Sequence, residues 1–208
     1  RSNQNVILLD STGRTYSVAA HSLPSARGQG EPVTGRLNAP SGATFNGILM
    51  GEDNQYLLMA TDAGYGFVAK LEDLHTKNRS GKTTISIPKG GRVLSPKPVS
   101  DIEGSLVVAV SNEGRMLVFP LSELPQLARG KGNKLINIPS SRLQARDEFM
   151  VSVAVISTGQ QLLVHSGKRY LNLKLSDLEH YRGERGRRGN KLPRGFQKVD
   201  RIEIANTE

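Results

Sequence analysis

The chain has 208 residues, of which 37% are hydrophobic, and this length favours one folded unit over two ordinary domains. It contains no cysteine, which excludes disulfide frameworks, thiolate zinc sites and cysteine nucleophiles, and its longest nearly apolar stretch, 149–156, is far too short to span a membrane. With 28 Lys and Arg against 19 Asp and Glu the net charge is +9, which favours a polyanionic partner.

The first residue is Arg1, with neither an initiator methionine nor a charged-then-apolar leader behind it. We therefore expect the chain to be a piece of a longer protein. The lack of cysteine is typical of a reducing compartment, so the cytosol is the expected location.

An apolar run followed by a glycine turn recurs four times along the chain. The runs cover 6–9, 56–60, 106–110 and 162–164, and the glycines after them are 51, 50 and 53 residues apart. Further landmarks keep the same phase, and a period of this length is typical of propellers and other repeat folds. We expect one domain, 1–208, with repeats at about 1–51, 52–102, 103–156 and 157–208. The phased landmarks are the glycines Gly13, Gly64, Gly114 and Gly167, the leucines Leu23, Leu74, Leu124 and Leu178, and the prolines Pro40, Pro88, Pro139 and Pro193.

Each repeat is predicted to form strands, because short runs of aliphatic and β-branched residues are bounded by Gly, Asn, Asp, Ser or Pro. Residues 111–114 are predicted as a hairpin turn, and further short runs such as 84–87 and 93–99 complete a unit of four strands. The predicted fold is all-β and β-propeller-like, with about four four-stranded blades. Four blades are few for a closed ring, so the ring is either open or truncated.

The excess positive charge lies in one segment of each repeat, after the phased leucine. Four windows, 23–36, 74–82, 127–134 and 182–194, hold 14 basic residues and 2 acidic ones, so the rest of the chain is slightly acidic. We call these windows the basic loops. Their Lys and Arg residues are the predicted DNA-binding residues: Arg27, Arg36, Lys77, Arg79, Lys82, Arg129, Lys131, Lys134, Arg182, Arg185, Arg187, Arg188, Lys191 and Arg194.

Equivalent loops of a propeller lie on equivalent parts of its rim, so the basic loops predict a positive stripe along a curved edge. Glycines let the backbone approach phosphates, while Arg and Lys supply charge, and no base-reading helix accompanies them. The expected partner is double-stranded DNA, bound with little sequence preference and strong salt dependence. The alternative for any one loop is a solvated turn. For 182–194 a disordered basic tail is also open, although the alternation of Val199, Ile202 and Ile204 favours an ordered loop followed by a strand.

The four-repeat pattern and the segments 25–32 and 128–134 resemble the C-terminal domain of the A subunit of bacterial topoisomerase IV, along essentially the whole chain. The resemblance implies a β-pinwheel, in which neighbouring blades exchange strands. The related gyrase A domain carries a box of glutamine, basic residues and glycines, of which every copy here is degenerate. Arg129, Lys131 and Lys134 give the closest match, whereas Gln29 stands where a basic residue is expected.

The resemblance also implies a non-catalytic role, in which the domain captures and bends the transported DNA segment to direct decatenation and supercoil relaxation. The active-site tyrosine would lie in another domain, and this domain would hold no cofactor, with ATP and magnesium used elsewhere in the holoenzyme. The implied partners are the B subunit of the topoisomerase and the remainder of its A subunit. The implied location is the cytoplasm and nucleoid, with peripheral inner-membrane association open for the full-length family.

Other classes of function have weaker support in the sequence. A protein-interaction propeller that serves as a scaffold is the main alternative, because a fold alone does not define a function. An enzyme with its site at the propeller axis would need converging carboxylates, histidines or a metal. The four histidines have no ligand spacing, so we expect no metal site. They are His21, His75, His165 and His180.

Overall fold

Four antiparallel hairpins form the framework of the fold. The computed structural model of the chain describes residues 5–19 and 37–207. A third strand pairs with the first strand of each hairpin, and the predicted turn at 111–114 is confirmed. The hairpins are β1 (Asn5–Asp10) with β2 (Arg14–Ala19), β4 (Tyr56–Thr61) with β5 (Tyr65–Lys70), β8 (Leu106–Ser111) with β9 (Arg115–Pro120) and β12 (Gln160–Ser166) with β13 (Arg169–Leu173), and the third strands are β3 (Phe45–Leu49), β7 (Lys97–Val99), β11 (Met150–Ile156) and β15 (Arg201–Asn206).

Three short strands are exchanged between neighbouring sheets. β6 (Lys82–Thr83) pairs with β2, β10 (Asn133–Lys134) with β5, and β14 (Asn190–Lys191) with β9. Each of these strands therefore leaves its own repeat and completes the sheet of the repeat before it. This is the strand exchange of a β-pinwheel. The sheet orders are β3-β1-β2-β6, β10-β5-β4-β7, β11-β8-β9-β14 and β13-β12-β15.

Two details differ from the sequence prediction. Three sheets have the predicted four strands, but the last has three within the described residues. The strand predicted at 84–87 is wrong, because the strand lies just before it at Lys82–Thr83, and the strand predicted at 93–99 is shorter, at Lys97–Val99. Between these two strands the chain crosses from one sheet to the next and makes only isolated bridges, at Ile85 and Val93. A strand at Arg201–Asn206 confirms the returning strand predicted after the last basic loop.

Short helical turns follow the second strands of three hairpins. They are η3 (Leu71–Leu74), η4 (Leu121–Glu123) and α2 (Leu175–Leu178), the last continued by η5 (Glu179–Tyr181). Leucines three residues apart point the same way in such a turn, so Leu71 and Leu74 both reach the core. A separate helix, α1 (Ser140–Gln144), precedes β11.

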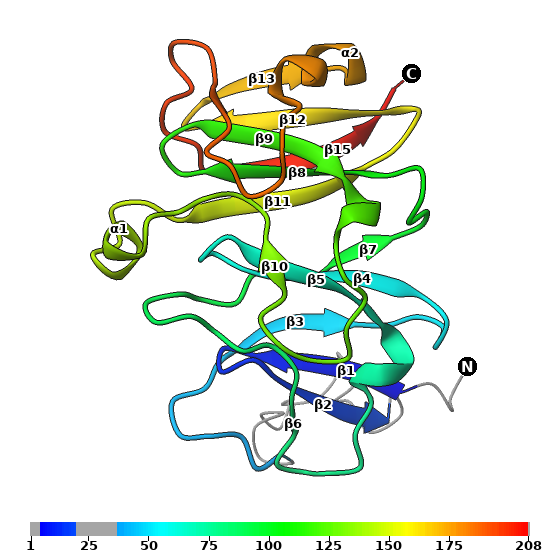
Figure 1. The fold of residues 1–208 in the computed structure, drawn as a ribbon. Helices are drawn as coiled ribbons and strands as arrows, with labels where there is room; N and C mark the ends of the chain where they lie inside the picture. The colour runs from blue at the N-terminus through cyan, green and yellow to red at the C-terminus, as the bar shows by residue number, and fades with distance from the viewer. Residues whose placement is uncertain (1–4, 20–36, 208) are drawn as a thin grey trace.

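The sheets are stacked in a row, with the first and last hairpins at opposite ends (Figure 1). Along β4, Leu57 and Met59 pack toward the first sheet, whereas Leu58 and Ala60 pack toward the third. Because both faces of an inner sheet are buried, its strands are continuous apolar runs and not alternating ones.

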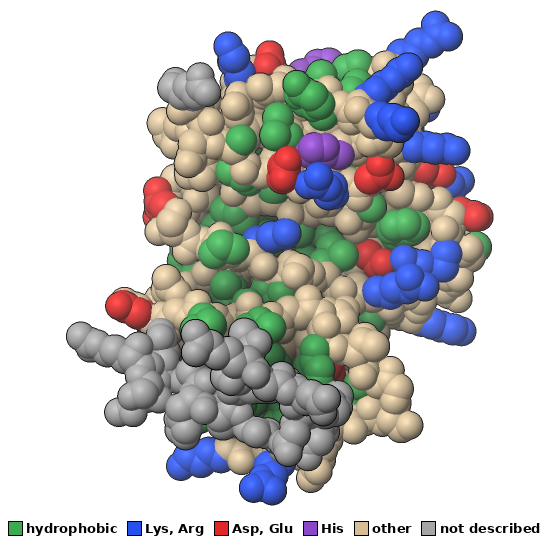
Figure 2. Space-filling model, turned by 180° about the vertical axis from the view of Figure 1, so that it is seen from behind, with side chains coloured by type: hydrophobic (Ala, Val, Ile, Leu, Met, Phe, Trp, Pro, Cys, Tyr) green, Lys and Arg blue, Asp and Glu red, His purple; other side chains and the backbone are tan. Residues whose placement is uncertain are grey.

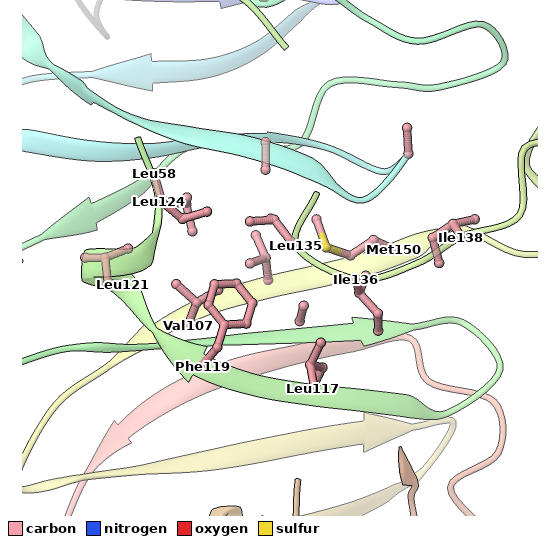
Figure 3. Packing of buried hydrophobic residues seen from close by; sticks show 14 of the residues in the cluster. Leu58, Val107, Leu117, Phe119, Leu121, Leu124, Leu135, Ile136, Ile138 and Met150 are labelled. Carbon is pink, nitrogen blue, oxygen red and sulfur yellow. The ribbon is translucent and has the colours of Figure 1, made fainter. Parts of the chain in front are cut away.

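The core between the second and third sheets shows how the elements interlock (Figure 3). Phe119 of β9 and Met150 of β11 meet Leu58 of β4 and Leu135, which directly follows the exchanged strand β10. The exchanged segment therefore contributes to the core as well as to the sheet edge.

A glycine just before each exchanged strand allows its backbone to lie against the preceding sheet. A Cβ on Gly132 would lie 2.0 Å from the Gly66 oxygen, and one on Gly189 would lie 2.3 Å from the Met116 oxygen. Both glycines have positive φ, of +77° and +74°. These positions need glycine for space and for conformation.

Replacing Gly132 by alanine is expected to lower the free energy of unfolding by roughly 3 kcal/mol, because strain at positive φ and a backbone clash add together. Gly159 is a matched control, since its φ is +82° but nothing lies within 4 Å of its Cβ position. The Gly159→Ala variant should lose only about 1 kcal/mol in urea unfolding. Equal losses in the two variants would show that the close approach costs nothing.

Candidate nucleic-acid interface

The exchanged strands place the three described basic loops, 74–82, 127–134 and 182–194, along the outer edges of the sheets. Each loop leads directly into an exchanged strand, whose second residue pairs with the first residue of the preceding hairpin's second strand. Thr83 faces Arg14, Lys134 faces Tyr65, and Lys191 faces Arg115. Thr83, Lys134 and Lys191 thus occupy equivalent positions.

Consecutive basic loops are joined by one repeated backbone hydrogen bond. The Asn38 amide donates to the Arg79 carbonyl at 3.0 Å, Ser86 to Gly130 at 3.0 Å, and Asn137 to Arg187 at 2.9 Å. In each case the donor lies just beyond one loop, and the acceptor lies within the next. The bonds from Ser86 and Asn137 link the three described basic loops into a continuous row, which we call the rim row, and the bond from Asn38 adds the segment that follows the first window.

Several side chains of the rim row are free to meet a ligand. Lys131 lies 4.7 Å from the ring centroid of Tyr65, which holds the ammonium group at the surface. The others are exposed and have no ion-pair or side-chain hydrogen-bond partner within the described residues. They are Lys77, Arg79, Arg129, Lys191 and Arg194.

Other predicted residues are engaged in contacts within the rim row. Lys82 Nζ donates to the Asp73 carbonyl, Lys134 Nζ to Asn137 Oδ1 at 3.3 Å, and Arg185 Nη1 to the Lys134 carbonyl at 2.7 Å. Two more pair with nearby glutamates at the surface, Arg182 Nη1 with Glu179 at 3.6 Å and Arg187 Nε with Glu184 at 2.9 Å. Exposed pairs of this kind are weak and leave the arginines available to a stronger anion.

Arg188 is the most constrained of the predicted residues. Its Nη1 donates to the Asn137 carbonyl at 2.8 Å and lies 2.7 Å from Oε1 of the fully buried Glu148, an ion pair without hydrogen-bond geometry. Its Nη2 donates to Glu148 Oε2 at 3.1 Å, and Arg142 pairs with the same carboxylate. Arg188 therefore anchors the last basic loop, in addition to any role in binding.

Arg27 and Arg36, together with the rest of the window 23–36, lie outside the described residues. Two basic residues on the rim, each at the start of the second strand of a hairpin, were missed by the sequence prediction. Arg14 Nη1 donates to the Ser80 carbonyl at 3.1 Å, and Arg115 Nη1 to the Gly189 carbonyl at 3.4 Å. The sequence signal that could have identified these residues is a basic residue soon after the hairpin glycine.

The described residues offer little for other chemistry. No group of three or more His, Cys, Asp or Glu side chains within them could hold a metal ion. His75 pairs with Asp53 at 3.0 Å, and His165 with Glu203 at 2.7 Å. Hydrogen bonds with His165 and then with Arg201 lower the pKa of Glu203. Among the described residues, no helix is long and apolar enough to cross a membrane.

Stacked hairpin sheets, three of them completed by a strand from the next repeat, define the class of gyrase-type C-terminal propellers. Residues 55–100 and 105–157 match the family described as DNA gyrase C-terminal domain, beta-propeller. The solved C-terminal domain of E. coli ParC matches with a TM-score of 0.91 and 47% identity, covering 100% of this chain and 83% of that one. The chain belongs to the family of C-terminal domains of the topoisomerase IV A subunit.

Relatives from several bacteria agree with this assignment. The A subunit of DNA topoisomerase 4 from Pseudomonas aeruginosa is 56% identical over 204 residues, and the one from Escherichia coli K12 is 48% identical over 204 residues. Each alignment covers 98% of this chain and 27% of the relative, so the chain spans about a quarter of their length. A solved gyrase A C-terminal domain, at 17% identity and a TM-score of 0.70, covers 96% of this chain and 64% of that one and shares the fold.

Proposed function

We propose that this chain is the non-catalytic DNA-binding and DNA-bending domain of a topoisomerase IV A subunit, and that duplex DNA lies along the rim row. The observation that carries the proposal is the repeated hydrogen bond between consecutive basic loops, which sets exposed Arg79, Arg129 and Lys191 on one continuous edge. Phosphates recur about every 1.7 Å along a duplex, so a continuous basic edge meets many of them at once.

The rim row favours bending for a geometric reason. The loops belong to successive stacked sheets, and their spacing is fixed by backbone bonds and not by flexible side chains. A duplex that bends to contact successive sheets pays a deformation energy, which the additional phosphate contacts offset. Since these contacts do not read bases, the binding is expected to have little sequence preference.

In the whole protein, the proposed role is to capture the transported duplex and so direct decatenation and supercoil relaxation. The B subunit and the remainder of the A subunit are the proposed partners, and the nucleoid is the proposed location. The cleaving tyrosine, ATP and magnesium would belong to other parts of that assembly. The relatives from Pseudomonas aeruginosa and Escherichia coli, each about four times as long as this chain, support this assignment.

The experiment is fluorescence anisotropy of the chain with a labelled duplex of about 40 base pairs, titrated from low to physiological salt. We expect equal affinity for a scrambled sequence, a steep log-log salt slope, and increased energy transfer between dyes at the two duplex ends. Absence of binding even at low salt would contradict the proposal and favour the protein-interaction scaffold. Binding without a change in energy transfer would contradict DNA bending but not DNA binding.

A further inference from the structure

The two ends of the stacked sheets carry opposite charge. One end, which we call the hairpin end, is formed by the hairpin turns and by the loops that return from the exchanged strands. Arg92 is fixed there by the hairpin of the second sheet, because its amide donates to Asp62 Oδ1 at 2.7 Å. The exposed cations that bear on this end, outside the rim row, are Lys89, Arg92, Arg142, Lys168, Arg169 and Lys198.

Few anions offset these cations. Of the acidic residues at the hairpin end, Asp62 and Glu148 are buried and each is paired with arginine. Glu113 pairs with Arg142, Asp200 Oδ2 accepts the Gly167 amide at 2.6 Å, and Asp147 is exposed. In the reversed view of Figure 2 this end is on the right, where Lys and Arg side chains project along the edge.

The opposite end, where the second strands finish, is acidic, and we call it the acidic end. Glu72 and Asp53 are held side by side there, since the Glu72 amide donates to the Asp53 carbonyl at 3.1 Å. The helical turns that follow the second strands of the later sheets also carry carboxylates at this end. Exposed carboxylates at this end include Asp53, Glu72, Asp101, Glu123, Asp177 and Glu179. Glu72 pairs with Lys70, Asp53 with His75 and Glu179 with Arg182, and the other three have no ion-pair partner among the described residues.

The distance between the ends makes their effects separable. A six-residue strand is about 20 Å long, whereas the Debye length at physiological salt is about 8 Å. The acidic end therefore does not cancel the field of the hairpin end. A polyanion on the rim is attracted toward one end and repelled from the other.

We propose that the duplex does not lie centrally on the rim row but is displaced toward the hairpin end, where Lys89, Arg92 and Lys198 add contacts to its phosphates. This rests on the proposed function and adds an orientation to it. The hairpin end is continuous with the rim, because Lys191 of the rim row and Lys198 line one cleft of about 900 Å³ together with Arg115 and Arg142. The cations of this cleft outnumber its carboxylates, which are Glu113, Asp147 and Asp200. A phosphate backbone that leaves the rim at the last sheets meets cations on this side and carboxylates on the other.

The direct test is tethered DNA cleavage, which the absence of cysteine makes simple. Ser141 of α1 is exposed at the hairpin end, and Ser122 of η4 is exposed at the acidic end. Each is replaced by cysteine and labelled with an iron chelate that cuts DNA nearby. We expect strong cleavage of a bound 40-base-pair duplex by labelled Ser141→Cys and little by labelled Ser122→Cys. Equal cleavage from both positions would overturn the displaced path.

Charge reversal gives an independent test. The double variant Lys89→Glu, Lys198→Glu alters two exposed side chains that have no described partner. The control is Lys70→Glu, Lys174→Glu, at equivalent positions beside the ends of β5 and β13 at the acidic end. We expect the first double variant to bind at least about 10-fold more weakly, with a salt slope smaller by about 1.8, and the control to change binding less than about 3-fold.

The outcomes separate this inference from the proposed function. Equal losses in the two double variants would mean that only net charge matters, and the displaced path would be wrong while DNA binding stands. No loss in either variant would also contradict the displaced path. Failure of the unmodified chain to bind DNA would instead contradict the proposed function itself. Thermal unfolding of each variant checks that its fold is intact.

Discussion

The Arg146→Ala variant is expected to lose about 3 to 5 kcal/mol of unfolding free energy, because it leaves a buried carboxylate without its counter-ion. Arg146 Nη2 lies 2.7 Å from Oδ2 of Asp62, whose side chain is 4% exposed. Arg146 Nη1 donates to the Gly90 carbonyl at 3.0 Å, and its guanidinium carbon lies 4.4 Å from the Phe149 ring centroid. The pair joins the hairpin of the second sheet to the segment before β11 in the third.

Charge burial can be separated from lost packing in the same experiment. In the Arg146→Ala background, Asp62→Asn removes the unpaired charge but keeps an oxygen that can accept the Arg92 amide. We expect this second change to recover at least about 1 kcal/mol, since an uncharged amide costs less to bury than a carboxylate. Further loss on adding Asp62→Asn would show that the charge was not the cause.

The control for the Arg146–Asp62 pair is an ion pair that is exposed to solvent. Arg187 and Glu184 form one in which both side chains are 72% exposed. Arg187→Ala should lower the unfolding free energy by less than about 1 kcal/mol. If Arg146→Ala lowers the free energy of unfolding in urea by no more than Arg187→Ala does, the ion pair between Arg146 and Asp62 does not stabilise the contact between the second and third sheets.

Backbone strain at Arg146 can be measured too. Its φ of +59° is the one positive value for a residue other than glycine within the described residues. Arg146→Gly loses the same ion pair but relieves a strain that arginine and alanine share. It should therefore be less destabilised than Arg146→Ala by about 1 kcal/mol.

The repeat and its hairpins could be predicted because their signals are local. An apolar run and a glycine turn lie within about ten residues of each other, as in β8 and β9 around Gly114. The exchanged strands carry no such signal. Lys82–Thr83 is a strand only because β2, far away in the sequence, supplies the partner. Their existence followed from the resemblance, but their register needed the structure.

The sequence also could not predict which basic residues are free at the surface and which are paired within the protein. Arg129 and Arg188 stand in similar glycine-rich settings, yet the first is free at the surface and the second pairs with buried Glu148. That carboxylate is 40 residues away from Arg188, and no local pattern marks it as buried. Net charge in a window therefore predicts an electrostatic surface more reliably than it predicts which side chains can bind.

One substitution in each of three linked loops should have the largest effect on DNA binding. We expect the triple variant Arg79→Ala, Arg129→Ala, Lys191→Ala to bind a 40-base-pair duplex on the order of 100-fold more weakly at physiological salt, with a salt slope smaller by about 2.7. The reason is the loss of three phosphate contacts, each of which releases about 0.9 counterion. Anisotropy titrations over several salt concentrations give both quantities.

The control for the triple variant removes the same charge elsewhere. Lys70→Ala, Lys97→Ala, Lys174→Ala lowers the net charge equally but lies outside the rim row and the hairpin end. Its salt slope should stay within about one unit of the unmodified chain. Because exposed Arg79, Arg129 and Lys191 have no side-chain partner among the described residues, their removal should leave the fold intact. Equal loss of affinity in both triple variants would mean that DNA responds to net charge, and that the hydrogen-bonded row of loops is not what it contacts.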